Sequence, residues 1–335
     1  MRARAGLGAY GRGSARRWSR VYGRRLHGHA SRMTNPLTRV AIVLNNASGD
    51  GAADAARLAI APVFKAAGIG AEFLMLAEGD DLAAMLTRIL ASGVDVIVAG
   101  GGDGTVNSVA AAVVGHDVTF GVIPLGTLNH FARDLGIPLD AADAAGVIVA
   151  GHTMPVDVAE VNGRIFLNNS SVGLYPRIVR LRERYKARGI VKWVVATWAT
   201  FRVTRRSNPL RVLLDVDGKR VSRITPLVFI GNNEYRMAGF DAGSRASLTD
   251  GRLAIYIVAT SGQLGFLKLT WRILTGTAHG SSDMLMLRAT EATIDVPDEV
   301  ATTQLPVALD GEIDSVELPL HYAIRPGALR VAVPR

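Results

Sequence analysis

The first half of the chain alternates between short apolar runs and alanine-rich stretches. The apolar runs are rich in β-branched residues, which favour strands, and the alanine-rich stretches have helical spacing. Predicted strands cover residues 39–44, 71–76, 94–98, 119–124 and 154–158. Predicted helices cover residues 54–67, 81–92, 106–114 and 141–150. Strands that alternate with helices in this way predict an α/β domain built on a parallel sheet with both faces covered.

From about residue 160 onward, strand patterns dominate. Runs that favour strands cover residues 164–168, 210–216, 225–230, 253–258, 292–296, 306–309 and 329–333. Pairs such as Asp310-Gly311 and Pro326-Gly327 predict turns between them. Residues 176–204 and 264–275 interrupt the pattern with helical stretches. This half is therefore predicted to be a mainly antiparallel β-sandwich, with the last strand a candidate to return to the first domain.

The N-terminal end carries all of the excess positive charge. The net charge is +9, and residues 1–32 contain nine arginines but no lysine, aspartate or glutamate. We predict that residues 1–36 form a disordered basic arm, so the charge gives no reason to expect nucleic-acid binding. The composition of the arm is similar to that of a transit peptide or an anionic-lipid anchor. The alternative is that translation starts at Met33.

The composition also excludes some classes of site. The chain contains no cysteine, which rules out disulfides and thiolate metal sites. No apolar run reaches about 18 residues, so the sequence predicts no transmembrane helix.

A glycine-rich turn follows the predicted strand 94–98. Residues 100–105 read GGGDGT, and a predicted helix begins directly after them. A strand, a tight turn and a helix N-terminus together suit a phosphate group, because backbone N–H groups converge there. Asp103 alone would repel a phosphate, so its presence indicates Mg²⁺. The alternative is an ordinary strand-to-helix turn.

Two common phosphate-binding motifs are excluded. The dinucleotide pattern GxGxxG fails because Thr105 or Asn107 stands in place of its third glycine, and no GxxxxGK[ST] sequence is present. Residues 45–49 and 125–129 form two further polar turns, and each follows a predicted strand. In a parallel sheet all these turns lie at the carboxyl edge, where ligands bind.

Several short motifs in a fixed order resemble the diacylglycerol kinase catalytic-domain family, which includes bacterial lipid kinases and the sphingosine and ceramide kinases. The resemblance covers roughly residues 39–335. The motifs are NNASG at 45–49, GGDGTVN at 101–107, PLGTLN at 124–129, RDLGIP at 133–138, LDGE at 309–312 and PGAL at 326–329. The implied fold is an α/β domain of the NAD-kinase and diacylglycerol-kinase type over 37–158, which binds the nucleotide, and a β-sandwich over 159–335, which binds the lipid.

The resemblance implies ATP-dependent transfer of the γ-phosphoryl group to a hydroxyl of a diacylglycerol-like or sphingoid lipid, with ATP and Mg²⁺ as cofactors. The implied catalytic residues are Glu312 as proton acceptor, Asp310 to orient it or meet Mg²⁺, and Asp103. The implied ATP-binding residues are Asn45, Asn46, Ala47, Ser48, Gly49, Gly101, Gly102, Asp103, Gly104, Thr105, Val106, Asn107, Ser108, Thr127 and Asn129. The implied structural metal site is Ser247, Asp250 and Arg252. By itself, without the other motifs, Asp310-Gly311-Glu312 favours a plain hairpin turn.

This sequence departs from the family pattern at a few positions. Asn46 stands where the family usually has proline, Ala77 where threonine is frequent, and Ser108 where glutamate is common. His130 stands where many members carry an aspartate that works with the metal. A neutral histidine cannot supply that charge, although it could contact a phosphate or cap the following helix. His130 and Ala77 leave open a nucleotide-binding regulatory protein of the same fold without kinase activity. The GGDG turn leaves open an NAD kinase-like enzyme, because NAD kinases also carry such a turn.

The expected partners follow from the implied substrate. Residues 177–204 are rich in arginine and lysine before two tryptophans, which suits peripheral contact with anionic lipids or a solvated helix face. We expect a cytoplasmic protein, peripheral at the inner membrane face if this contact forms. A homodimer is one further expectation.

Overall fold

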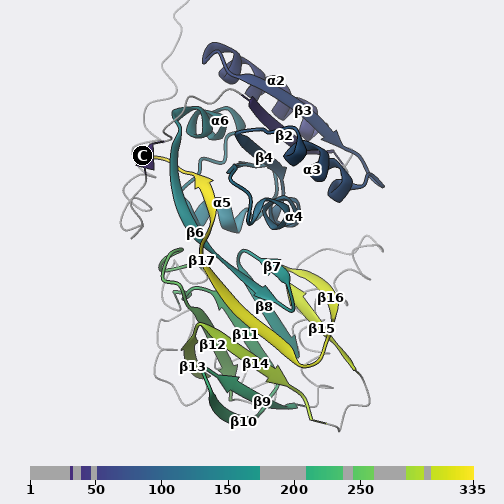
Figure 1. Ribbon diagram of the computed structural model, residues 1–335, viewed down its shortest axis with the longest axis vertical. Coiled ribbons are helices and arrows are strands. Elements are labelled where there is room, and N and C mark those ends of the chain that lie inside the picture. Colours follow the sequence, from purple (N-terminus) through teal and green to yellow (C-terminus); the bar gives the residue numbers. More distant parts are fainter. Residues whose placement is uncertain are drawn as a thin grey trace, which may run out of the picture.

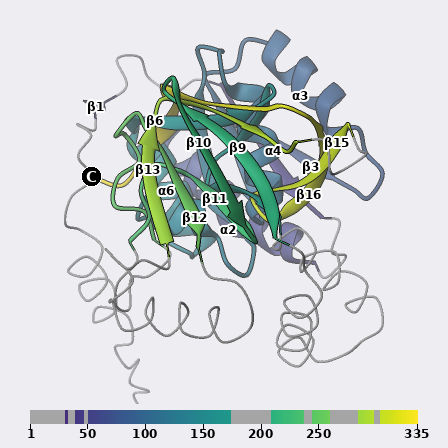
Figure 2. The ribbon, with the colours of Figure 1, turned by 90° about the horizontal axis from the view of Figure 1, so that it is seen from below.

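The computed structural model describes residues 31–32, 39–46, 51–173, 209–236, 244–259, 284–297 and 303–335. Of the predicted basic arm, residues 1–36, the structure describes only residues 31–32, which form β1. The predicted helices within 176–204 and 264–275 lie outside the described ranges. Figure 1 shows an α/β half above a β-sandwich half, with the long strands β6 (His152–Val161) and β17 (Leu320–Ala332) running between them. Seen from below, the sandwich lies in front of the α/β half (Figure 2).

The α/β half is a parallel sheet in the order β3-β2-β4-β5 with helices on both faces. Every residue of β4 and β5 is buried, as expected for apolar strands covered on two sides. Helix α2 packs beside α6, and α3 packs beside α4. The strands are β2 (Arg39–Asn45), β3 (Gly70–Leu76), β4 (Val96–Gly101) and β5 (Thr119–Pro124). The helices are α2 (Ala52–Ala66), α3 (Leu82–Ala91), α4 (Asp103–Val113), α5 (His130–Asp134) and α6 (Ala141–Ala150).

The sandwich half packs two antiparallel layers against each other. One layer has the strand order β13-β12-β11-β8-β15-β16, and the facing layer has the order β10-β9-β14-β17. Its shared core includes Phe166, Ile255, Ile294 and Tyr322, which come from both layers. The remaining strands are β1 (Ser31–Arg32), β7 (Arg164–Phe166), β8 (Asn169–Gly173), β9 (Leu210–Val216), β10 (Lys219–Thr225), β11 (Leu227–Asn232), β12 (Leu253–Val258), β13 (Met284–Ala289), β14 (Glu291–Asp295), β15 (Gln304–Leu309) and β16 (Glu312–Glu317).

Strand β17 joins the two halves into one sheet. It pairs with β14 near its start, with β6 along most of its length, and in parallel with β5 at Val331. The predicted turn at Pro326-Gly327 is wrong: the two residues lie inside β17, at a register shift between Arg325 and Leu329. A Pro-Gly pair favours a bulge as readily as a turn, and Gly327 has φ 60°. The predicted boundary at 158/159 falls within β6.

Other predicted strands differ in their extent. The predicted strand 225–230 spans the end of β10 and most of β11, which are separated at Pro226 because proline cannot donate to the sheet. The predicted strand 164–168 ends at Phe166. Within the described residues, no helix is both long and apolar enough to span a membrane.

A buried hydrogen bond across the sandwich yields a first prediction. The hydroxyls of Ser170 on β8 and Tyr322 on β17 are 3.0 Å apart, and both residues are buried. Tyr322→Phe or Ser170→Ala alone leaves one buried hydroxyl without its partner, and we expect each to lower the free energy of unfolding by about 1–2 kcal/mol. The double variant removes both polar atoms and should cost less than the sum. Urea unfolding measures all three, and strictly additive losses would contradict the contact.

Candidate active site

The turn after β4 folds back on itself because its glycines leave room. A Cβ placed on Gly101 would lie 2.7 Å from Cβ of Thr105, so only glycine allows Thr105 to approach. The Thr105 hydroxyl accepts a 2.6 Å hydrogen bond from the Asn45 side-chain amide at the end of β2. The predicted turns at residues 45–49 and 100–105 are therefore in direct contact.

The loop after β5 meets the same turn, backbone against backbone. A Cβ placed on Gly126 would lie 2.6 Å from Cα of Gly102, and the Leu125 N–H donates to the Gly101 carbonyl at 3.0 Å. The Asn129 side chain accepts from the Gly126 N–H at 2.9 Å and donates to its carbonyl at 2.7 Å. This bracing holds the loop that exposes Thr127.

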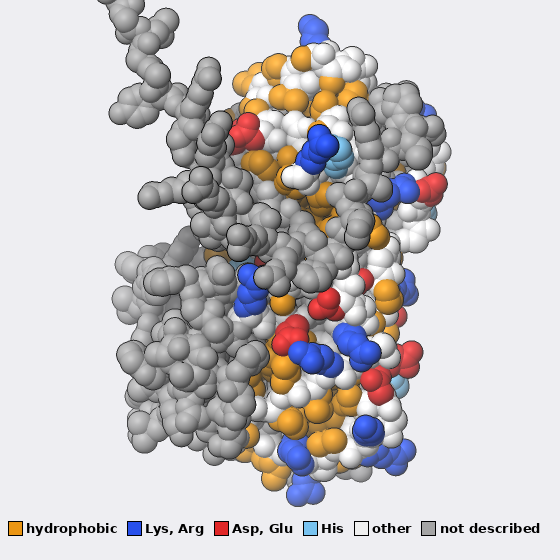
Figure 3. Space-filling view, turned by 90° about the vertical axis from the view of Figure 1, so that its left-hand side faces the viewer, with side chains coloured by type: hydrophobic (Ala, Val, Ile, Leu, Met, Phe, Trp, Pro, Cys, Tyr) orange, Lys and Arg blue, Asp and Glu red, His pale blue; other side chains and the backbone are white. Residues whose placement is uncertain are grey.

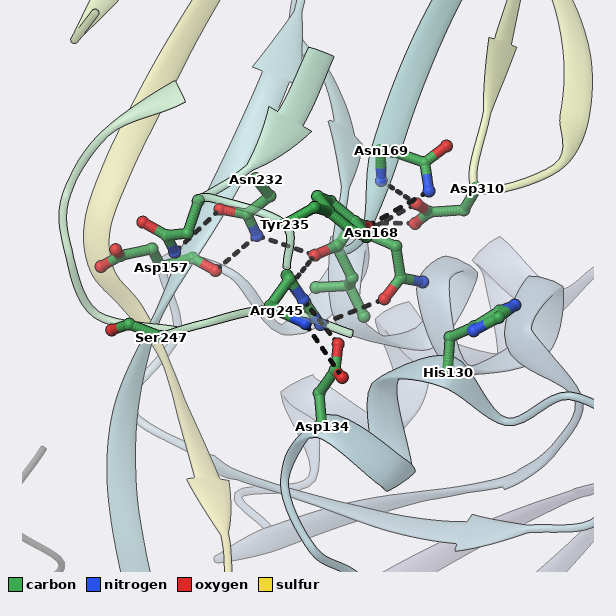
Figure 4. Close-up of polar contacts among 12 residues, drawn as sticks. His130, Asp134, Asp157, Asn168, Asn169, Asn232, Tyr235, Arg245, Ser247 and Asp310 are labelled. Carbon is green, nitrogen blue, oxygen red and sulfur yellow. Dashed lines mark hydrogen bonds and ion pairs between the residues drawn. The ribbon is translucent and has the colours of Figure 1, made fainter. Parts of the chain in front are cut away.

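Asp103 begins α4 and is tied to the next helix. Its Oδ1 accepts a 2.8 Å hydrogen bond from the backbone N–H of His130, the first residue of α5. The N-cap position of α5 is Asn129, so of the two alternatives for His130 the structure does not show the helix cap. The exposed His130 ring extends away from Asp134 at the other end of α5 (Figure 4).

Glu312 reaches this turn from the far end of the chain. It begins β16 directly after a tight hairpin turn in which Asp310 has φ 47° and Gly311 has φ 91°. A Cβ placed on Gly104 would overlap Oε1 of Glu312, so the carboxylate lies against the first turn of α4. Gly104 follows Asp103 directly, and the structure therefore places both acidic residues at the N-terminus of one helix.

Asp310 anchors the hairpin that carries Glu312. Its buried carboxylate accepts backbone N–H groups of Leu167, Asn168 and Asn169, each at 2.8 Å. Burial raises the pKa of the Asp310 carboxyl, while these three amides and the Arg245 guanidinium lower it. Both carboxylate oxygens are occupied by the amides. The contact observed for Asp310 is thus with residues 167–169, between β7 and β8.

The remaining predicted nucleotide residues have varied surroundings. Val106 is part of the core, Ser108 is exposed, and Ala47, Ser48 and Gly49 lie outside the described residues. The Asn46 N–H donates to the Leu76 carbonyl at 2.9 Å. The Asn107 amide points toward β7, where it donates to the Ile165 carbonyl at 3.4 Å.

The predicted metal residues Ser247, Asp250 and Arg252 lie beside β6 and β17. Asp157 on β6 accepts N–H groups from Gly251 at 2.6 Å and from Gly327 at 2.9 Å, which ties this loop to β17. Asp250 and Arg252 are exposed, and Ser247 is buried. In the part of the chain that the structure describes, no group of three or more His, Asp or Glu side chains has the arrangement of a metal site. A cation here would depend on the Asp250 carboxylate together with backbone oxygens, which are ligands that suit Mg²⁺.

A buried polar network beside these turns had no role in the sequence-based predictions. Arg245 pairs with Asp134 of α5 at 2.7 Å and also contacts Asn168 (Figure 4). Asn232 donates to the carbonyls of Asp157 and Leu167. Asp134 belongs to the RDLGIP motif, which was its only sequence signal.

Comparisons with known proteins identify the family of the chain. The family model "Diacylglycerol kinase catalytic domain" matches residues 39–161, and the model "YegS C-terminal NAD kinase beta sandwich-like domain" matches residues 171–333. A "Probable lipid kinase YegS-like" protein of Pseudomonas aeruginosa is 30% identical over 77% of this chain and 82% of its own length. The chain belongs to the diacylglycerol kinase family.

Further members of the diacylglycerol kinase family support this assignment. A diacylglycerol kinase of Bacillus subtilis is 29% identical over 65% of this chain and 71% of its own length. A YegS-like protein of Klebsiella pneumoniae is 40% identical, although the match spans 33% of this chain and only 38% of that protein. The crystal structure of a Bacillus anthracis protein described as a candidate diacylglycerol kinase has a TM-score of 0.70 and 26% identity, and it covers 90% of this chain and 99% of its own. The predicted fold class is confirmed.

The anchoring role of Asp310 predicts a stability effect. In Asp310→Asn the amide offers one acceptor oxygen where three N–H groups need partners, so we expect a loss of about 3 kcal/mol in the free energy of unfolding. Glu317→Gln, at an exposed position on β16, is the matched control and should change stability by less than about 0.5 kcal/mol. Urea unfolding provides the measurement. Equal stabilities of Asp310→Asn and the control would contradict the anchor.

Proposed function

We propose that this member of the diacylglycerol kinase family is an ATP-dependent kinase that phosphorylates the hydroxyl of a diacylglycerol-like or sphingoid lipid. One observation carries the proposal: Glu312, from the last hairpin of the sandwich, lies against Gly104, directly after Asp103 at the start of α4. A carboxylate at this place is next to a helix N-terminus that suits phosphates. This proximity supports the proposal that Glu312 accepts a proton beside a turn that binds phosphate.

The residues of the two turns would hold the nucleotide. Gly101 and Gly126 allow the two turns to pack closely, and the N–H groups at the start of α4 would bind the phosphate oxygens. Bound ATP with Mg²⁺ would supply the γ-phosphoryl group and neutralise its charge. The Asp103 carboxylate fits such a cation, because its position is fixed by the His130 N–H while its second oxygen has no hydrogen bond among the described residues.

Glu312 would act on the lipid. An alcohol that attacks a phosphorus atom must lose its proton, and a carboxylate within hydrogen-bond reach accepts it. The Glu312 side chain has no hydrogen bond or ion pair among the described residues, which leaves its oxygens available for that proton. Asp310 supports the reaction indirectly, because its anchor at residues 167–169 fixes the turn from which Glu312 projects.

A lipid substrate implies contact with a membrane surface, and we include that contact in the proposal. Residues 177–204, which suggested it, lie outside the described part of the chain. On the face shown in Figure 3, the described acidic and basic side chains of the sandwich half are interspersed. We likewise propose, as part of this function, that residues 247–252 bind a structural Mg²⁺.

The proposal predicts the effect of removing each carboxylate. Glu312→Gln keeps the shape of the side chain but cannot accept the proton, so kcat for lipid phosphorylation should fall at least about 100-fold. In Asp103→Asn, kcat should fall by a similar factor, because the negative charge that would face the cation is lost. Transfer of ³²P from labelled ATP to a panel of lipids, with Mg²⁺, measures both.

Glu317→Gln, on the same strand as Glu312, controls for charge loss and should phosphorylate at the parent rate. Parent-rate transfer by Glu312→Gln would contradict its assignment as base. If the unmodified chain binds ATP but phosphorylates no lipid, the regulatory alternative replaces the kinase, and transfer to NAD would favour the NAD kinase-like one.

The close approach at Gly104 predicts a separation of stability from activity. In Gly104→Ala the new methyl group displaces the flexible Glu312 carboxylate, while alanine favours a helix over glycine by about 0.5–1 kcal/mol. We therefore expect a folded protein of about parental stability with strongly reduced kcat. Gly146→Ala in α6 is the matched control, because a Cβ there meets nothing within 4 Å. If both variants are fully active, Glu312 does not work from the observed position.

A further inference from the structure

Arg245 binds helix α5 from the opposite half of the molecule. Its side chain is fully buried, and its Nε donates to Asp134 Oδ2 at 2.7 Å. The guanidinium carbon also lies 5.7 Å from the centre of the Phe131 ring, three residues earlier on α5. Arg245 itself is held by a β-bridge to Tyr235. One arginine of the sandwich half is thus fixed to the helix whose first N–H binds Asp103.

The same guanidinium also holds the peptide that anchors Glu312. Its Nη1 donates to the Leu167 carbonyl, and its Nη2 donates to Asn168 Oδ1 at 3.1 Å. Asp310 takes the N–H groups of these residues from the other side (Figure 4). Arg245 and Asp310 therefore bind the same short segment, residues 167–169, from opposite sides.

These contacts form a continuous path from Asp103 to Glu312, which lies against Gly104. From Asp103 the path passes through the His130 N–H to α5 and then through Asp134 to Arg245. From Arg245 it continues through residues 167–169 to Asp310, and then along the hairpin turn to Glu312. Arg245 is the link between the part of the path that holds Asp103 and the part that holds Glu312.

Stability alone does not explain a buried ion pair at this place. Apolar side chains of similar volume are often as stabilising, because burying two charges costs free energy of desolvation. A planar guanidinium with fixed donor directions does set the geometry of every group it contacts. The two carboxylates come from opposite halves of the molecule, so their separation depends on such a link.

We propose that Arg245 is a positioning residue that sets the place of Glu312 relative to Asp103 by joining α5 to residues 167–169. The inference rests on the proposed kinase function for its consequence in catalysis. Displacement of a reacting group by about 1 Å costs about 100-fold in rate. Loss of Arg245 should therefore lower kcat while leaving the nucleotide turns intact.

The kinetic test uses the full chain with Arg245→Met and Arg245→Lys. Below the unfolding transition, we expect Arg245→Met to lower kcat about 100-fold, with KM for ATP within about 3-fold of the parent. Arg245→Lys keeps the charge facing Asp134 but cannot also reach both the Leu167 carbonyl and Asn168 Oδ1. Its kcat should therefore fall less than that of Arg245→Met, by about 10-fold. If Arg245→Met does not fold, Arg245→Lys carries the test. Arg288→Met is the control, because Arg288 pairs with Glu234 at the exposed surface nearby, and its kcat should stay within about 2-fold.

A second measurement does not depend on activity. The chain has no cysteine, so Leu139→Cys after α5 and Glu317→Cys on β16, both exposed, give a unique pair of spin labels. The distance distribution between the labels should be narrow with Arg245 and broader or shifted in Arg245→Met and Arg245→Lys. Unchanged distributions together with parental kcat would overturn the proposal, as would a loss of stability as the sole effect. If the parent phosphorylates no lipid but the distribution still broadens, the proposed function fails and the positioning by Arg245 stands.

Discussion

The whole site depends on the absence of side chains at a few glycines. Gly102 and Gly126 approach each other so closely that a Cβ placed on Gly126 would lie 2.6 Å from Cα of Gly102. Gly104 leaves the space that Glu312 fills. Because of these approaches, four segments that are far apart in the sequence meet at the carboxyl edge of the parallel sheet. A larger residue at Gly126 would separate the two turns, and one at Gly104 would displace the carboxylate that would accept the proton.

The two halves of the molecule are held together by more than a linker. Strands β6 and β17 run through both, and β17 pairs with β14 of the sandwich and with β5 of the α/β sheet. The buried Asp157 on β6 also binds the N–H groups of Gly251 and Gly327. The hairpin that carries Glu312 belongs to the other sandwich layer, where β15 pairs with β8. That layer packs against the continuous sheet through the shared core, and Asp310 binds residues 167–169 beside β7 of that sheet.

Much of the fold follows from local patterns, and much of the site does not. Strands such as β2 and β5, buried on both faces, produce long apolar runs that predict them within a residue or two. Strand β16 was missed because most of its residues are exposed and its sequence lacks an apolar run. Strand β13 was missed because its short apolar run, Met284–Leu287, contains no β-branched residue. The glycine turn was evident, but Arg245 and Asp134 are 111 residues apart and carry no local signal of their contact. The role of Asp310 as an anchor depends equally on residues far along the chain.

The central claim is that the nucleotide lies between the glycine turn and Glu312. A crystal structure with a non-hydrolysable ATP analogue and Mg²⁺ tests it most directly. We expect the phosphates against the N–H groups at the start of α4, with the terminal phosphate facing the Glu312 carboxylate. A nucleotide bound elsewhere, or a terminal phosphate directed away from Glu312, would contradict the account.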